Sequence, residues 1–184
     1  MIIVAMRQFR PANAMPKNNI SQLPIRLAIA AAFALAIPAF VTAEPVSRPE
    51  LEGRGDMAEI AGDDAAMNAA IAEAQRSLPD FLARLRREKD NISDIGFKYP
   101  LAGWEHIWVA DVAEDGDYLT GTLSNIPAQP EYSLGDEVRV AKADISDWAY
   151  RDDKGIMQGH FTTRVLLDVI DPQQAAAIKA DFGW

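Results

Sequence analysis

The 184-residue sequence contains no cysteine and only two histidines, His106 and His160. The absence of cysteine excludes disulfides, thiolate nucleophiles and Cys-ligated zinc or iron-sulfur clusters. With no HxH or HExxH spacing, a zinc site would need both imidazoles together with carboxylates from separate segments. The sequence also lacks a Gly-rich phosphate loop and a GxSxG nucleophile motif. We therefore expect no metal and no cofactor.

Acidic residues are absent from residues 1–43, where basic residues precede an apolar run over residues 27–41. A basic segment, an apolar segment and then small residues form the pattern of a secretory signal peptide. Val41 and Ala43 occupy the positions three and one residues before the expected cut. We predict cleavage between Ala43 and Glu44, followed by export to the periplasm or the medium.

A retained membrane helix is the alternative interpretation of the same apolar run. The run is shorter than the roughly 20 residues that a spanning helix needs. It is also interrupted near its end by Pro38. We therefore expect no stable membrane anchor after cleavage.

Removal of residues 1–43 leaves 141 residues, which is enough for one domain with its own core. These residues carry 14 basic side chains against 27 acidic ones, a net charge of −13. Such a surface repels phosphate backbones and anionic lipid headgroups, so nucleic acid and membrane surfaces are not expected partners. A basic protein or a cation is a better electrostatic match.

The mature chain divides into a short leader and one domain. Residues 44–63 mix proline, glycine and charge without an apolar period, which predicts a flexible leader. Residues 64–184 are predicted to form a single α+β domain. Apolar residues at helical spacing predict one helix over about residues 63–78, and Pro79 is expected to begin a second helix.

From about residue 92 to 168 the pattern is that of strands. Segments 104–112 and 118–125 are expected to pair through a hairpin turn. Residues 157–167 alternate between apolar and polar side chains, which predicts a last strand, and residues 172–182 predict a closing helix. The predicted fold is α+β, with two N-terminal helices packed on a strongly twisted antiparallel sheet of five or six strands and a short C-terminal helix.

Five segments of this region share their order and spacing with a known family: EHIWV (105–109), GTLSNIP (121–127), GDEVRV (135–140), ISDWAY (145–150) and GHFTTRVL (159–166). Over about residues 64–168 the chain resembles the YegJ-like bacterial proteins, domain of unknown function family 2314. The resemblance implies a small α+β domain, often exported, with no assigned reaction, ligand or catalytic residue. It also implies an aromatic residue at the position of His160, which is therefore not expected to be a shared functional group.

Glu105 and His106 are the first candidates for a site because a carboxylate adjoins an imidazole. In a strand, neighbouring side chains point to opposite faces, so the two are not expected to form an acid-base pair. His106 shares its face with Trp104 and Trp108. We interpret it as a structural, hydrogen-bonded histidine, with contact to a ligand as the alternative.

Arg164 is the second candidate, on the polar face of the expected last strand. Its guanidinium could hold a carboxylate through two parallel hydrogen bonds. Glu105, Asp147 or Asp136 is the expected internal partner, and a bound anion is the alternative. We interpret the remaining candidates first as turn and packing residues: Asn125, Asp147 and Trp148.

The leading hypothesis is an exported, non-enzymatic module that binds a protein or small ligand in a cleft or at a strand edge. One alternative is a hydrolase-like enzyme that uses His106 with carboxylates or Arg164 from neighbouring strands. Another is an immunity or inhibitor protein for a basic partner, suggested by the net charge of −13. No catalytic residue is assigned, and the candidate ligand contacts are Glu105, His106, Asn125, Asp147, Trp148 and Arg164.

Overall fold

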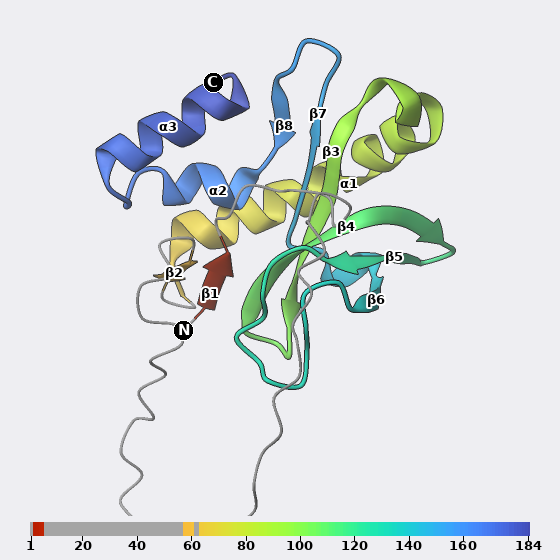
Figure 1. Ribbon diagram of the computed structural model, residues 1–184, viewed down its shortest axis with the longest axis horizontal. Helices are drawn as coiled ribbons and strands as arrows, with labels where there is room; N and C mark the ends of the chain where they lie inside the picture. The colour runs from red at the N-terminus through yellow and green to blue at the C-terminus, as the bar shows by residue number, and fades with distance from the viewer. Residues whose placement is uncertain (1, 6–56, 61–62) are drawn as a thin grey trace, which may run out of the picture. The chain divides into compact units, whose positions relative to one another are not determined.

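The computed structural model describes residues 2–5, 57–60 and 63–184 (Figure 1). All of them belong to one structural unit, and a second unit, residues 15–53, lies outside the described residues. Within the predicted signal peptide and leader, strands β1 (Ile2–Ala5) and β2 (Met57–Ile60) are described. The predicted cleavage site between residues 43 and 44 lies outside the described residues, so processing stays a prediction.

Helix α1 (Ala65–Glu88) is one continuous helix, and the prediction of two helices divided at Pro79 is wrong. Apolar residues on both sides of the proline, such as Leu78 before it and Phe81 and Leu85 after it, enter the same core. Proline removes one backbone donor from a helix interior. Here the continuous burial of one helix face offsets that loss, because packing supplies most of the stability of a helix in a protein.

Six antiparallel strands form the sheet of the predicted domain, in the order β6–β5–β4–β3–β7–β8. Their bounds are β3 (Ser93–Leu101), β4 (Glu105–Asp115), β5 (Tyr118–Leu123), β6 (Glu137–Ala141), β7 (Asp147–Arg151) and β8 (Met157–Gly159). Short 3-10 helices, η2 (Lys89–Asn91) and η3 (Lys142–Asp144), precede β3 and β7. The predicted α+β class and antiparallel sheet are confirmed. Strands β1 and β2 extend this sheet to eight strands.

The predicted last strand is wrong beyond residue 159. Strand β8 stops at Gly159, and helix α2 (Phe161–Leu166) follows. Gly159 and His160 have φ angles of 76° and 54°, in the left-handed region, and they turn the chain out of the sheet. A Cβ atom at Gly159 would collide with the backbone carbonyl of Trp148, so glycine is required there.

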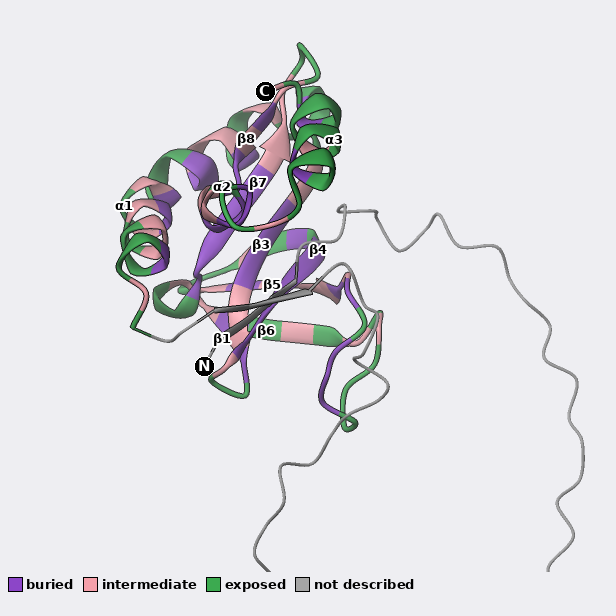
Figure 2. Ribbon diagram, turned by 90° about the vertical axis from the view of Figure 1, so that its left-hand side faces the viewer, coloured by how far each residue is buried: buried purple, intermediate pink, exposed green. Residues whose placement is uncertain are grey.

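The sheet is covered on both faces. Helix α1 packs on one face and helix α3 (Pro172–Phe182) on the other, so the strands lie between them in Figure 2. The predicted closing helix is confirmed in α3, whose first N–H groups donate to the Asp171 carboxylate. Within the described ranges, no helix is long and apolar enough to cross a membrane.

Candidate functional site

A buried polar cluster lies on the side of the sheet away from α1. Strand alternation explains its position, because Phe97 and Trp148 face α1 and their neighbours in sequence point the other way. His106 is the most exposed member, at 6%. The cluster consists of Lys98 on β3, His106 on β4, Asp147 on β7, and His160 and Thr162 at the start of α2.

Asp147 fixes the start of α2 to the sheet. Its carboxylate accepts hydrogen bonds from the backbone N–H of Phe161 at 3.1 Å and of Thr162 at 2.8 Å. It also accepts one from the Thr162 hydroxyl at 2.6 Å. Complete burial raises the pKa of Asp147, although the nearby Lys98 charge and these donors act in the opposite direction. The carboxylate thus caps a helix that begins 14 residues later in the chain, at Phe161.

Lys98 is a fully buried amine on the central strand β3. Its Nζ donates to the Thr162 hydroxyl at 2.8 Å and lies 4.6 Å from the centroid of the Trp108 ring. Burial lowers the pKa of Lys98 to about 8, and the Asp147 carboxylate partly opposes that effect. Lys98, Thr162 and Asp147 therefore form a chain of donor, hydroxyl and acceptor inside the domain.

His106 lies close to this chain but has its own partner. Its Nδ1 atom is 2.8 Å from the hydroxyl oxygen of Ser146, in a buried hydrogen bond. Burial, and then the charge of Lys98, lowers the pKa of His106 to about 4. The imidazole is therefore neutral at neutral pH.

Glu105 points to the opposite face from His106, as the alternation predicts. Both of its carboxylate oxygens accept from the backbone N–H of Ala128, at 2.9 and 3.1 Å. The backbone N–H of Trp108 donates to the side-chain oxygen of Asn125 at 3.3 Å. Glu105 and Asn125 thus attach the loop after β5 to strand β4.

Trp148 and Arg164 occupy separate surroundings. Trp148 faces α1, where its indole N–H donates to the Ala74 carbonyl at 3.1 Å. Arg164 lies on α2 and not on a strand, and its Nε donates to the Gly159 carbonyl at 3.2 Å. Its guanidinium carbon is 3.6 Å from the centroid of the Trp184 ring. The expected ion pair between Arg164 and an internal carboxylate is not among the ion pairs of the described residues.

His160 is enclosed by aromatic rings. The centroids of the Trp108 and Phe182 rings are each 4.6 Å from the centroid of its imidazole. Nδ1 is hydrogen-bonded to the Thr163 hydroxyl at 3.0 Å, whereas Nε2 is buried without a partner among the described residues. Burial and the surrounding cations hold the pKa of His160 well below its usual value. The imidazole is therefore packed between aromatic rings inside the domain.

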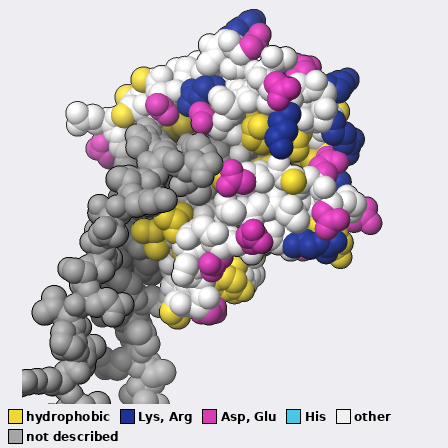
Figure 3. Space-filling model, turned by 45° about the vertical axis from the view of Figure 1, so that its right-hand side comes forward, with side chains coloured by type: hydrophobic (Ala, Val, Ile, Leu, Met, Phe, Trp, Pro, Cys, Tyr) yellow, Lys and Arg dark blue, Asp and Glu magenta, His cyan; other side chains and the backbone are white. Residues whose placement is uncertain are grey.

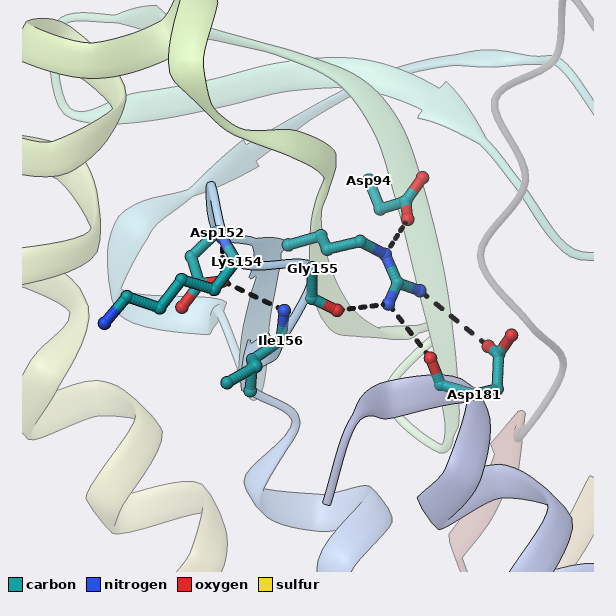
Figure 4. A network of polar contacts seen from close by, with 7 residues as sticks. Asp94, Asp152, Lys154, Gly155, Ile156 and Asp181 are labelled. Atoms are coloured by element: carbon teal, nitrogen blue, oxygen red, sulfur yellow. Dashed lines mark hydrogen bonds and ion pairs between the residues drawn. The ribbon is translucent and has the colours of Figure 1, made fainter.

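Arg151 on β7 connects Asp94 on β3 with Asp181 on α3, two residues that Figure 4 labels. Its Nε is 2.7 Å from the Asp94 carboxylate, and its Nη1 donates to the carbonyls of Gly155 at 2.8 Å and Asp181 at 2.9 Å. The indole N–H of Trp184 adds a hydrogen bond to the Met157 carbonyl at 2.9 Å. These contacts keep the end of α3 over the polar cluster.

Lys98 and Thr162 were not predicted as members of the cluster. The structure brings together only part of the predicted candidate set. His106 and Asp147 lie on the same face near Lys98, and the Arg164 charge acts on Asp147 and His160, whereas Glu105, Asn125 and Trp148 have other surroundings. The sequence signal that could have indicated Lys98 is a lysine that lies between two aromatic residues, 97 and 99, of a strand. Among the described residues, no group of three or more carboxylates and imidazoles is placed to hold a metal ion.

Residues 64–184 match the model of a family described as uncharacterized protein conserved in bacteria, DUF2314. The chain is 31% identical over 123 residues to the uncharacterized protein YegJ of Escherichia coli. The aligned region covers 64% of this chain and 78% of that protein. It is 34% identical over 84 residues to a putative ankyrin repeat protein of Neisseria meningitidis serogroup B, covering 43% of this chain and 33% of that protein. No solved structure matches the chain at a comparable level.

Proposed function

Since the chain belongs to the uncharacterised bacterial family DUF2314, we propose that it is an exported module that binds a protein or small ligand without catalysing a reaction. The burial of the reactive side chains is the main support. Lys98, His106 and Asp147 are each at most 6% exposed and bond to groups inside the domain. A general base or nucleophile must reach its substrate, and these groups do not reach the surface.

The loop over residues 124–136 offers a surface suited to binding. Its ends are joined, because the N–H of Gly135 donates to the Leu123 carbonyl at 2.9 Å. It presents Ile126, at 46% exposure, and Tyr132, at 36%. Hydrophobic side chains also emerge in small groups among acidic and basic ones on the face shown in Figure 3. Compact loops with joined ends on a rigid scaffold are frequent binding elements.

Export is the first part of the proposal to test. A bacterial strain that expresses the full chain is fractionated, and the intact mass of the protein is measured in each fraction. We expect the periplasmic or secreted protein to begin at Glu44. A cytoplasmic or membrane-bound protein that retains residues 1–43 would contradict export.

The absence of catalysis is tested on the purified, exported protein. Activity towards ester and peptide substrates is compared between the natural chain, His106→Gln and Ser146→Ala, after NMR spectra show that the variants remain folded. We expect the same background rate for all three, because the two side chains are at most 6% exposed in the unprocessed chain. Turnover that both substitutions abolish would favour the hydrolase alternative.

A role as an immunity or inhibitor protein for a basic partner is the second candidate. The loop after β5 and the first residue of β6 favour it, because residues 124–137 contain three acidic side chains and no basic one. An electrostatic interface of this kind weakens with salt. Capture from an extract at low and high salt tests it, and failure to retain any basic protein at low salt counts against it.

A further inference from the structure

A short strand from the start of the chain lies on the edge of β4. Strand β1 runs parallel to β4, with Ile3 opposite Glu105 and Val4 opposite His106. The other edge of the same part of β4 is occupied by β3, in which Tyr99 lies opposite Ile107. Strand β1 thus closes an edge that the six antiparallel strands leave open.

Backbone alternation identifies the groups that β1 covers. On the edge of β4 away from β3, the Trp108 carbonyl accepts from the N–H of Ser124 at 2.9 Å, and its N–H donates to Asn125. Backbone groups of a strand point alternately to its two neighbours, so His106, two residues earlier, directs its N–H and C=O to the same edge. Ile107 directs its own groups to β3. The backbone of His106 is therefore what β1 pairs with.

Cleavage after residue 43 would remove β1 and leave this edge open. We propose that, in the processed chain, the edge of β4 around His106 binds an extended segment of a partner protein, which adds parallel to β4 in the place of β1. The proposal rests on the export proposed above, because processing is what vacates the edge. Unpaired strand edges readily accept strands from other chains, and such β-augmentation is a common mode of peptide recognition.

The segment that occupies the edge in the structure indicates the chemistry of the partner. Residues 2–5 are Ile-Ile-Val-Ala, rich in the β-branched residues that favour strands, and Arg7 and Arg10 follow. The processed chain carries a net charge of −13, which favours a segment with basic flanks. The expected partner is therefore a protein with an exposed, extended apolar segment followed by basic residues.

A synthetic peptide of residues 1–10, MIIVAMRQFR, serves as the probe. Amide hydrogen exchange is measured by NMR in the unprocessed chain, in the processed chain from the periplasm, and in the processed chain with peptide. We expect the N–H of His106 to exchange at least about tenfold faster after processing and to regain protection with peptide. The N–H of Ile107, which faces β3, is the matched control and should stay protected throughout.

A second peptide with Ile3→Pro and Val4→Pro lacks two backbone donors and should bind at least about tenfold more weakly than the first. The unprocessed chain should bind neither peptide, because β1 occupies the edge.

Equal affinity for the two peptides would overturn strand addition. Continued protection of His106 in the processed chain without peptide would also overturn it, since the edge would then be filled by the chain itself or by a second copy. Finding residues 1–43 on the exported protein refutes the export proposal, whereas absence of peptide binding to a processed chain refutes only this inference.

Discussion

Both faces of the sheet carry apolar clusters, but the face towards α3 also carries a buried chain of polar groups. Towards α1, Phe81 stacks on Trp148 with ring centroids 5.2 Å apart, in a core of aliphatic and aromatic side chains. Towards α3, Lys98, Thr162 and Asp147 form a buried chain of hydrogen bonds. The first face gains stability from the apolar area removed from water, which is tolerant of small changes in geometry. The second depends on each polar group keeping its own partner.

This difference predicts how each face responds to damage. Loss of a ring from the α1 face leaves a cavity whose cost does not depend on pH. Loss of one polar group from the other face leaves a second group buried and unpaired, and that cost depends on charge.

Replacement of Asp147 by alanine is expected to have the largest effect. It removes the partner charge of Lys98 and the acceptor for the first N–H groups of α2, so the free energy of unfolding should fall by about 4 kcal/mol. Urea unfolding followed by circular dichroism measures the loss. Asp144→Ala, at an exposed carboxylate, is the control and should change stability by less than about 0.5 kcal/mol.

A double substitution separates the charge from the helix cap. With Lys98→Met added to Asp147→Ala, no unpaired charge remains, so at least about 1 kcal/mol of the loss should be recovered. If the double variant is less stable than Asp147→Ala alone, the interaction between Lys98 and Asp147 is not what stabilises this face.

Phe81→Ala tests the apolar face. The ring is 1% exposed and stacks on Trp148, so its removal should lower the free energy of unfolding by about 3 kcal/mol. The loss should be the same at pH 5 and pH 8. Phe81→Leu, which keeps most of the volume, should cost less than about 1.5 kcal/mol. A loss that changes with pH would show that the two faces are coupled.

The pH dependence of the free energy of unfolding measures the contribution of His106. Its pKa is about 4 in the folded chain, against an ordinary value near 6.5, so the unfolded chain binds more protons between these values. The contribution of neutral His106 to the free energy of unfolding is fully present above about pH 6.5. It falls by about 3 kcal/mol in total as the pH drops to 4. The lowered pKa of His160 acts in the same direction and the raised pKa of Asp147 in the opposite one. Subtracting the curve of His106→Gln from that of the natural chain removes these shared contributions. An NMR titration of His106 with a midpoint near 6.5 would contradict the expected shift.

Local rules predicted the features that depend on neighbouring residues. The alternation of β4 separates Glu105 from His106, the turn at Gly116 joins β4 to β5, and Asp171 caps α3. Each depends on strand period, on positive φ at glycine or on capping within three residues. Each of these features therefore depends mainly on residues close together in the sequence.

The polar face could not be predicted in this way, because its contacts join distant segments. Asp147 caps a helix that follows an intervening strand, and Lys98 is buried where it donates to Thr162 at the start of α2. Strand β3 also continues through Pro100, although proline is rare inside a sheet. The missing N–H of Pro100 would point past the start of β7 and not towards β4, so no bond in the sheet is lost.

Pro79→Ala gives the smallest effect and tests whether packing alone explains the continuous helix α1. Pro79 is exposed, so the substitution leaves the apolar face intact and restores a backbone donor to the carbonyl one turn earlier. We expect the free energy of unfolding to rise by about 1 kcal/mol, since the gain in the helix exceeds the added freedom of the unfolded chain. Thermal and urea unfolding measure the gain, with the exposed neighbour substitution Asp80→Ala as the control for helix propensity. A decrease in stability would show instead that the shape imposed by Pro79 is needed to seat both Leu78 and Phe81 against the sheet.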